Sequence, residues 1–338
     1  MYWRFTKIFL ITIILQLVVI MLAAWLGGVA IIIGFWVSIV NMTILSVMVG
    51  ILYFYAVEGN WGNLIDTSVV DIEQVDIPMK DDWKMAALLI KRRDAGEQDG
   101  GRPAIICHHG LGSSSKKHLK FAIPLAMMGM VAILPDARGH GASVGRIKAR
   151  KDDWYITEST GIIPDLHAIV DFVEKRDDIN PGKISMMGAS LGGGVCLTSG
   201  MMDDRLNLVI AVNPYFSIKE MMEARRAKIP FTEPWFMKTG LRFMVNFRKL
   251  KKVEERISPK HVLASTTRDK AERKMRLVFC EDDHLVLPEV GAKRMIDVFQ
   301  LPDRCVLSLK KGDHNYRGQE TIVLTRIVQW LEEAGMLP

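Results

Sequence analysis

A serine between small residues is the group in this chain best placed to do chemistry. The stretch Gly188-Ala189-Ser190-Leu191-Gly192 follows a short, mostly apolar run and precedes a segment typical of a helix. The pattern G-x-S-x-G suits a sharp turn from a strand into a helix, because its glycines let the two backbones approach closely. A serine in such a turn is strained and exposes its hydroxyl, so Ser190 is predicted to be a nucleophile.

A histidine base should accompany this serine, because a serine hydroxyl is a weak nucleophile until its proton is removed. Three histidines follow Ser190 in the chain. His314 is the preferred base, since its loop comes directly after the last predicted strand. His284 adjoins the candidate acid and is poorly placed to donate to it, and His261 lies in a segment that returns from a predicted insertion.

The histidine needs a carboxylate to orient it, and this acid is expected after the preceding strand. Glu281, Asp282 and Asp283 occur there in a row. Asp283 is the preferred acid and Asp282 is the alternative. The resulting order of serine, acid and histidine is the one expected when the nucleophile lies in a G-x-S-x-G turn.

Two backbone amides are predicted to stabilise an oxyanion beside Ser190. One is the N–H of Leu191, the residue after the nucleophile. The other is the N–H of Leu111 in the segment His109-Gly110-Leu111-Gly112, which follows an earlier buried strand. An ordinary glycine-rich turn is the alternative interpretation of that segment.

Alternating strands and helices must position these groups. Two strands near 75–78 and 83–92 are followed by alternating segments of both kinds. The later predicted strands are 104–108, 131–135, 184–188, 206–213, 275–280 and 304–309, and the predicted helices are 116–128, 166–175, 191–201, 288–299 and 320–333. Such alternation predicts an α/β fold with a mostly parallel sheet and helices on both faces. Residues 214–273 interrupt it and are predicted to form a helical cap insertion.

Several motifs in order resemble the α/β-hydrolase superfamily over about residues 68–335. They are His109-Gly110-Leu111-Gly112, Asp136-Ala137-Arg138-Gly139-His140-Gly141-Ala142-Ser143, the Ser190 turn, Asp283 with Val286 and Pro288, and Gly312-Asp313-His314. Within the superfamily, the chain is similar to monoglyceride lipases, serine aminopeptidase-like hydrolases and related carboxylesterases. The resemblance implies structural roles for Asp136, Arg138 and His140, and it leaves the substrate open. Cys280 departs from the glycine that family members often carry there.

The amino-terminal region predicts a membrane anchor. No charged residue occurs from Ile8 to Val57. As a helix this run would be roughly 75 Å long, against about 30 Å for the hydrocarbon core of a bilayer. Two transmembrane helices near 5–26 and 34–56 are therefore expected in a domain of residues 1–57, followed by a hydrolase domain of residues 58–338. A cleaved signal peptide with one span is the alternative.

Charge and cysteine content favour a cytoplasmic location for the second domain. Arg4 and Lys7 are the only charges before Glu58, so the positive-inside rule places the amino terminus, and after two spans the domain, in the cytoplasm. The four cysteines form no C-x-x-C pair, which favours free thiols in a reducing compartment. The net charge of +6 is spread along the chain, so nucleic acid is not an expected partner. No metal or other cofactor is predicted.

These observations favour a membrane-anchored serine hydrolase acting on lipid or long-acyl esters, with the lipid bilayer and an ester substrate as partners. A basic, amphipathic helix predicted over 236–252 could cover the active site or rest on the membrane. A peptidase or acyltransferase would use the same three residues. A non-catalytic binding protein could also reuse the fold.

Overall fold

The structure is a computed structural model that describes residues 67–93, 100–144, 161–228 and 254–337, together with isolated helical positions between 18 and 45. The chain divides into two compact units, Met1–Trp61 and Gly62–Pro338. Apart from those isolated positions, the predicted spans at 5–26 and 34–56 lie outside the described residues. Among the residues that are described, no helix is both long and apolar enough to cross a membrane.

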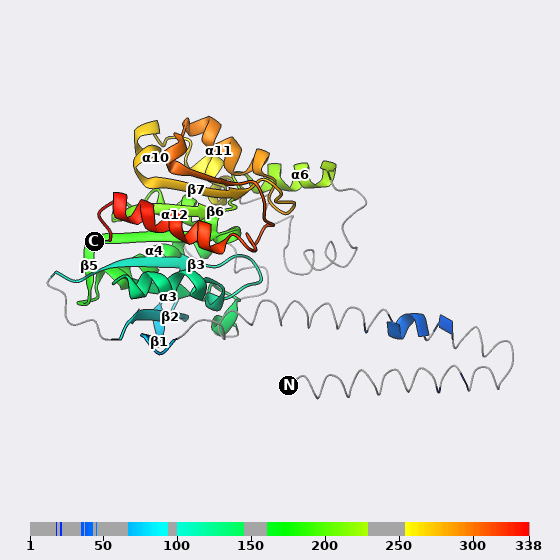
Figure 1. The fold of residues 1–338 in the computed structure, drawn as a ribbon, viewed down its shortest axis with the longest axis horizontal. Coiled ribbons are helices and arrows are strands. Elements are labelled where there is room, and N and C mark those ends of the chain that lie inside the picture. The colour runs from blue at the N-terminus through cyan, green and yellow to red at the C-terminus, as the bar shows by residue number, and fades with distance from the viewer. Residues whose placement is uncertain are drawn as a thin grey trace. The chain divides into compact units, whose positions relative to one another are not determined.

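Eight strands of the second unit form one sheet in the order β1-β2-β4-β3-β5-β6-β7-β8 (Figure 1). Their bounds are β1 Val70–Pro78, β2 Lys84–Arg92, β3 Arg102–His108, β4 Val131–Pro135, β5 Ile179–Ala189, β6 Leu206–Val212, β7 Met275–Cys280 and β8 Val306–Leu309. The pairs β1–β2 and β2–β4 are antiparallel, and every later neighbour in this order is parallel. The prediction of a mostly parallel sheet is confirmed.

Helices cover both faces of this sheet (Figure 1). Their bounds are α3 Leu119–Met127, α4 Ile162–Glu174, α5 Leu191–Val195, α6 Ile218–Lys228, α9 Pro259–Val262, α10 Arg268–Lys274, α11 Ala292–Phe299 and α12 Glu320–Glu333. One core cluster joins the strands to α3 and α12, and a second joins them to α4, α5, α10 and α11. Central strands are therefore buried on both faces, which explains continuous apolar runs such as β4.

Three predicted helices are interrupted in the structure. The helix expected over 116–128 begins as a 3-10 turn, Ser115–His118, before α3. The helix expected over 191–201 is α5 followed by a π-helical turn, Cys196–Gly200. The helix expected over 288–299 breaks at Gly291, where an added Cβ would lie 2.6 Å from the carbonyl oxygen of Pro214. Close backbone packing, which residue spacing does not reveal, sets this last boundary.

The predicted insertion at 214–273 falls between β6 and β7. Its described parts contain α6, α9 and α10, while the amphipathic helix predicted over 236–252 lies outside the described residues. The bounds of the insertion and of the two predicted domains remain predictions.

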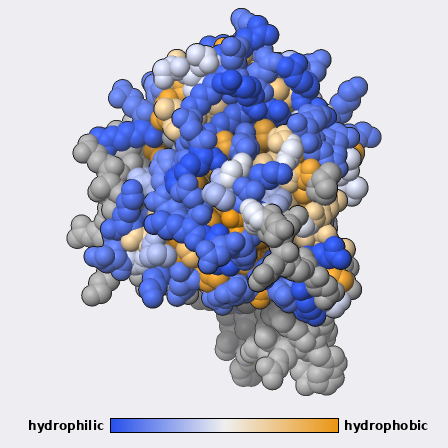
Figure 2. Space-filling view, turned by 90° about the vertical axis from the view of Figure 1, so that its left-hand side faces the viewer, coloured by the Kyte–Doolittle hydropathy of each residue, from blue (hydrophilic) through white to orange (hydrophobic). Residues whose placement is uncertain are grey.

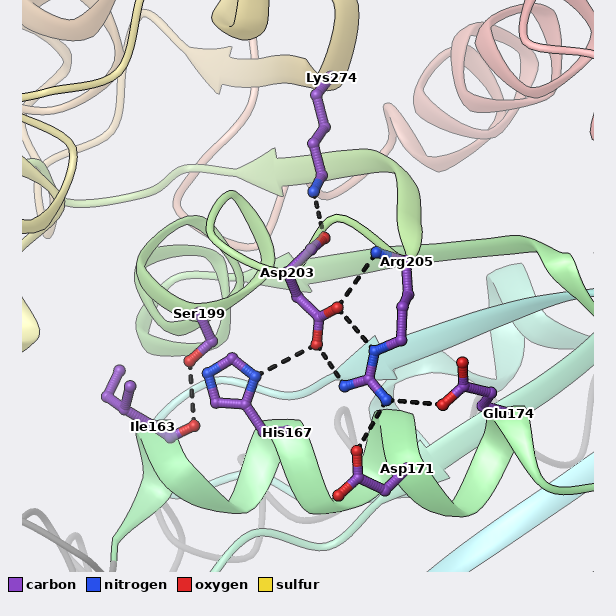
Figure 3. Close-up of polar contacts among 8 residues, drawn as sticks. All are labelled: Ile163, His167, Asp171, Glu174, Ser199, Asp203, Arg205 and Lys274. Carbon is purple, nitrogen blue, oxygen red and sulfur yellow. Dashed lines mark hydrogen bonds and ion pairs between the residues drawn. The ribbon is translucent and has the colours of Figure 1, made fainter.

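An ion-pair network joins the starts of β6 and β7 to α4 (Figure 3). Arg205 Nη2 lies 2.6 Å from Asp203 Oδ2, and Arg205 Nη1 lies 2.7 Å from Asp171 and 2.8 Å from Glu174. Lys274 Nζ donates to the backbone carbonyl of Asp203. The surface shown in Figure 2 is largely hydrophilic, as expected of a globular domain that keeps its apolar side chains in the core.

Candidate active site

Ser190 lies at the junction between β5 and α5, as predicted from the sequence. Its φ of 56° and ψ of −120° place it in a region that non-glycine residues rarely adopt. Such a conformation costs on the order of 1–3 kcal/mol and persists only where the surrounding structure enforces it. Here the Ser190 N–H donates to the carbonyl of Val212 at 2.8 Å, which ties the turn to β6. The serine side chain is half-buried.

Glycines on either side of Ser190 make this turn possible. A Cβ at Gly188 would lie 2.4 Å from the carbonyl oxygen of Gly192. A Cβ at Gly192 would lie 2.3 Å from the carbonyl oxygen of His108. Both distances are too short for any side chain, so the G-x-S-x-G pattern reflects close contact between β5, α5 and the end of β3.

Asp283 and His314 meet at the carboxyl ends of β7 and β8. His314 Nδ1 lies 2.7 Å from Asp283 Oδ2, while Asp283 Oδ1 accepts the backbone N–H groups of Leu285 at 2.8 Å and Val286 at 3.0 Å. Asp283 is 2 % exposed, whereas the side chain of Asp282 faces solvent. The structure therefore brings Asp283, and not Asp282, to the histidine.

This contact fixes the tautomer of His314. A carboxylate can only accept, so Nδ1 must carry the proton and Nε2 is left with its lone pair. The ring thus presents an acceptor on the side away from Asp283, as a general base requires. In the described part of the chain, no hydrogen bond joins Ser190 Oγ to this ring.

The loop that carries Leu111 packs directly against the Ser190 turn. A Cβ at Gly110 would lie 3.2 Å from Ser190 Cβ and 3.8 Å from Ser190 Oγ. His109 holds this loop, because its Nε2 accepts the N–H of Ala137 at 3.0 Å and its Nδ1 therefore donates to the Gly110 carbonyl at 2.8 Å. The peptide that this carbonyl shares with the Leu111 N–H is thereby oriented.

Burial keeps the ring of His109 neutral. The pKa of His109 is lowered well below its usual range by burial and by the neighbouring His108 and His140. Burial also lowers the pKa of His108 to about 4 and that of His118 to about 3. Protonation of His109 Nε2 would displace the Ala137 N–H, so a neutral ring is required for the observed loop.

The second predicted oxyanion donor, the Leu191 N–H, is in the first turn of α5. Amides in a first turn have no acceptor within their helix, and they are available to an oxyanion. Leu111 and Leu191 both pack against one apolar cluster. This cluster contains Tyr215, Ile218, Met222, Ile257 and Val286. The side chains of both leucines are partly buried and therefore lie on a buried apolar cluster.

The residues from Asp136 to His140 make contacts within the scaffold. Asp136 accepts the N–H groups of Ser115 at 2.6 Å and Ala142 at 2.8 Å. Arg138 makes a bidentate contact to Asp81 at 2.6 and 2.7 Å and also pairs with Asp165. These bonds hold the turn between β1 and β2 against α4.

Asn213 is the residue near the site that the sequence did not indicate. It follows β6, is 2 % exposed, and donates from Nδ2 to the backbone carbonyl of His314 at 2.8 Å. A polar residue at the end of a buried strand was the available signal. Among the residues that the structure describes, no group of three or more His, Cys, Asp or Glu side chains could hold a metal ion.

The sheet order, the strained serine turn and the Asp283–His314 pair define an α/β-hydrolase architecture. Solved structures agree on the fold: an acetyl xylan esterase from Paenibacillus sp. R4 matches with a TM-score of 0.56 at 19 % identity, over 79 % of this chain and 85 % of that one. The sequence profile of the serine aminopeptidase S33 hydrolases matches residues 101–311. The chain belongs to that family.

Curated relatives are similar over shorter segments. The quorum-quenching protein AidA of Acinetobacter baumannii (strain MDR-ZJ06) is 29 % identical over 120 residues, which cover 33 % of this chain and 36 % of that protein. Esterase YjfP of Escherichia coli (strain K12) is 26 % identical over 102 residues, which cover 30 % of this chain and 41 % of that protein. The matched segments thus span well under two thirds of these relatives.

Proposed function

We propose that this protein is a serine hydrolase that cleaves carboxylic esters through an acyl-enzyme. The observation that carries the proposal is the 2.7 Å contact between His314 Nδ1 and buried Asp283, on the same edge of the sheet as the strained Ser190 turn. This contact leaves His314 Nε2 as the base that Ser190 requires. Esterase YjfP and the acetyl xylan esterase from Paenibacillus, both similar to this chain, also favour an esterase.

In the proposed reaction, Ser190 Oγ attacks the ester carbonyl carbon while His314 Nε2 takes its proton. The N–H groups of Leu111 and Leu191 stabilise the oxyanion. His314 then gives the proton to the departing alcohol, and water, deprotonated by the same ring, releases the acid and restores the serine. The scheme requires a hydrogen bond between Ser190 and His314 to form when substrate binds.

The partly buried side chains of Leu111 and Leu191 favour a substrate with a long acyl chain or another lipid. These two residues would bring the reacting carbonyl next to apolar side chains, and each CH₂ group buried against them would contribute about 0.8 kcal/mol. We therefore propose monoacylglycerols, lysophospholipids or acyl thioesters as substrates to test first. The lipid proposal fails if purified enzyme hydrolyses short soluble esters well and ignores all three lipid classes.

We further propose that residues 1–57 anchor the enzyme to the lipid bilayer with its hydrolase domain in the cytoplasm. The described positions of this region are helical, and they expose large apolar side chains: Met21 by 71 %, Phe35 by 63 % and Trp36 by 61 %. Apolar side chains exposed on a helix suit a lipid environment. A reporter fused to the carboxyl terminus that is active only outside the cell would contradict the orientation.

A fluorophosphonate probe tests the activated serine. Labelling of the wild type and its loss in Ser190→Ala are expected. Ser185→Ala is the matched control, because Ser185 lies on the same strand and is fully buried, and this variant should label as the wild type does. Folded wild-type protein that does not react would instead favour a non-catalytic binding protein.

The family description favours one alternative, a peptidase that uses the same three residues. An esterase and a peptidase would share the acylation chemistry, so the catalytic residues alone do not separate them. Comparing amides and esters that carry the same aminoacyl group distinguishes the two possibilities. An acyltransferase would be revealed by transfer to an added alcohol in place of water. A kcat/KM for amides above that for matched esters would overturn the esterase proposal.

A further inference from the structure

Two consecutive residues at the end of β6 touch all three segments of the candidate site. The carbonyl of Val212 accepts the N–H of Ser190 at 2.8 Å. The N–H of Asn213 donates to the carbonyl of Val278 at 2.7 Å, and the Asn213 side chain accepts the N–H of Cys280 at 2.9 Å. The same side chain donates to the carbonyl of His314 at 2.8 Å.

The orientation of the Asn213 amide follows from these partners. The Cys280 N–H can only donate, so Asn213 must turn Oδ1 toward it. Nδ2 then faces the His314 carbonyl, which can only accept. Flipping the amide would set donor against donor and acceptor against acceptor in a buried place, so only one orientation is compatible with the structure.

The backbone of Asn213 restricts which residues could replace it. Its φ is +46°, in the left-handed region that most side chains avoid and that asparagine and aspartate tolerate better. Aspartate could keep the Cys280 contact, but its second carboxylate oxygen would face the His314 carbonyl without a proton to share. Glycine could keep the backbone and would lose all three side-chain hydrogen bonds, to the Cys280 N–H, the Cys280 Sγ and the His314 carbonyl. Asparagine combines the required backbone with one donor and one acceptor.

We propose that Asn213 is a positioning residue that holds His314 in reach of Ser190. The three catalytic segments leave different strands, and the Nδ2 contact is a side-chain bond from β6, next to the nucleophile, to the loop that carries the base. His314 is held at its ring by Asp283 and at its backbone by Asn213. The inference rests on the proposed hydrolase function, because it assigns Asn213 a role in the reaction of Ser190.

The test compares Asn213→Gly with the wild type in the full chain. Active sites are first counted by complete reaction with a fluorophosphonate, and kcat and KM for p-nitrophenyl butyrate are then expressed per labelled serine. Because a misplacement of about 1 Å can cost 10²-fold in rate, we expect kcat per site to fall by about 10- to 100-fold with KM within about twofold. The rate constant of fluorophosphonate labelling should fall in parallel.

Gln300→Gly is the matched control. Gln300 also has a positive φ, +49°, and an amide side chain that accepts from Arg268 at 3.1 Å, but it ends α11 in an exposed position. Its variant should keep the wild-type kcat per site. Asn213→Asp is the second test variant, since it retains an acceptor for the Cys280 N–H and removes the Nδ2 donor, which contacts the His314 carbonyl at 2.8 Å and Cys280 Sγ at 3.9 Å. It should also lose kcat.

The outcomes separate a positioning role from a purely structural one. A structural role would lower the thermal midpoint and the number of labelled sites, yet leave kcat per labelled site at the wild-type value in both Asn213 variants. That result would overturn the assignment and leave the proposed function intact. Wild-type enzyme that labels no better than Ser190→Ala would overturn the proposed function, and the role of Asn213 with it.

Discussion

Replacing Asp283 with asparagine changes one donor–acceptor relation in the buried contact to His314. Oδ1 of Asp283 accepts two backbone N–H groups, from Leu285 and Val286. The asparagine must keep its oxygen toward these donors, because leaving a buried N–H unsatisfied costs about 1–3 kcal/mol. Its NH₂ group then faces His314 in place of Oδ2. A donor there requires Nδ1 of the ring to become an acceptor.

The expected loss follows from this change of tautomer. With Nδ1 accepting from the asparagine, a neutral ring carries its proton on Nε2 and cannot take one from Ser190. The same substitution in a Ser-His-Asp site lowers kcat by about 10⁴-fold with the geometry intact. At about 1.36 kcal/mol per factor of ten, this is roughly 5.5 kcal/mol of transition-state stabilisation. The fold should survive, since the shape of the side chain is unchanged.

Steady-state hydrolysis of p-nitrophenyl butyrate measures this loss, and Asp282→Asn is the control. Asp282 is adjacent in sequence and exposed, so its variant should retain kcat within about twofold, as expected of a carboxylate that faces solvent. Asp283→Asn protein that keeps most of its kcat would refute the reasoning about the tautomer. A large loss of kcat in Asp282→Asn alone would assign the role of the acid to Asp282 in place of Asp283.

Three further predictions concern the loop beside Ser190 and the charges at the start of β6 and β7. Gly110→Ala should slow fluorophosphonate labelling, because the added Cβ would lie 3.2 Å from Ser190 Cβ. Arg205→Ala should lower the free energy of unfolding in urea by about 1–3 kcal/mol, because buried Asp203 would lose its guanidinium partner. Burial lowers the pKa of Lys274 to about 8 in the folded protein, against 10.5 ordinarily, so the unfolded chain binds more protons between these values. Its contribution to the unfolding free energy should therefore rise with pH across that window, and Lys274→Met should remove the rise.

Each of these predictions has a control. Gly182→Ala adds a methyl group at an exposed position and should label at the wild-type rate. Lys270→Ala breaks an exposed pair with Asp204 and should cost under about 1 kcal/mol. Equal losses of unfolding free energy in Arg205→Ala and Lys270→Ala would contradict the expectation that the ion pair of buried Asp203 contributes more than the exposed pair. An unchanged pH dependence in Lys274→Met would assign the effect to another group.

The turn at Ser190 could be predicted because its determinants are local. Gly188, Ser190 and Gly192 are contiguous, and the contacts that exclude larger side chains lie within β5, α5 and the adjacent end of β3. The identity of the acid is harder to predict, because three consecutive acidic residues follow β7 and each satisfies the expected order of serine, acid and histidine. Only the path of the backbone after β7 turns Asp283 inward and Asp282 toward solvent.

Asn213 could not be assigned from sequence because its partners are distant. Its side chain bonds Cys280 and His314, which lie 67 and 101 positions further along the chain. The interrupted helices have a similar origin. The break at Gly291 reflects its approach to Pro214, and the turn after α5 includes a bond from the Thr198 hydroxyl to the Ile257 carbonyl at 3.2 Å. Tertiary contacts, rather than helical propensity, set these boundaries.

The neutral histidines behind the loop of Gly110 have a consequence for acid tolerance. Burial lowers the pKa of His108 to about 4 and that of His118 to about 3, and it lowers the pKa of His109 well below its usual range. These three rings therefore stay uncharged where an exposed imidazole, with a pKa near 6.5, would gain a proton. Mild acidification should therefore leave the hydrogen bond between His109 and Gly110 in place. Anionic lipids concentrate cations, protons among them, at a bilayer surface. If the protein acts at such a surface, the hydrogen bonds that hold the loop of Gly110 would be unchanged at a local pH below that of the surrounding medium.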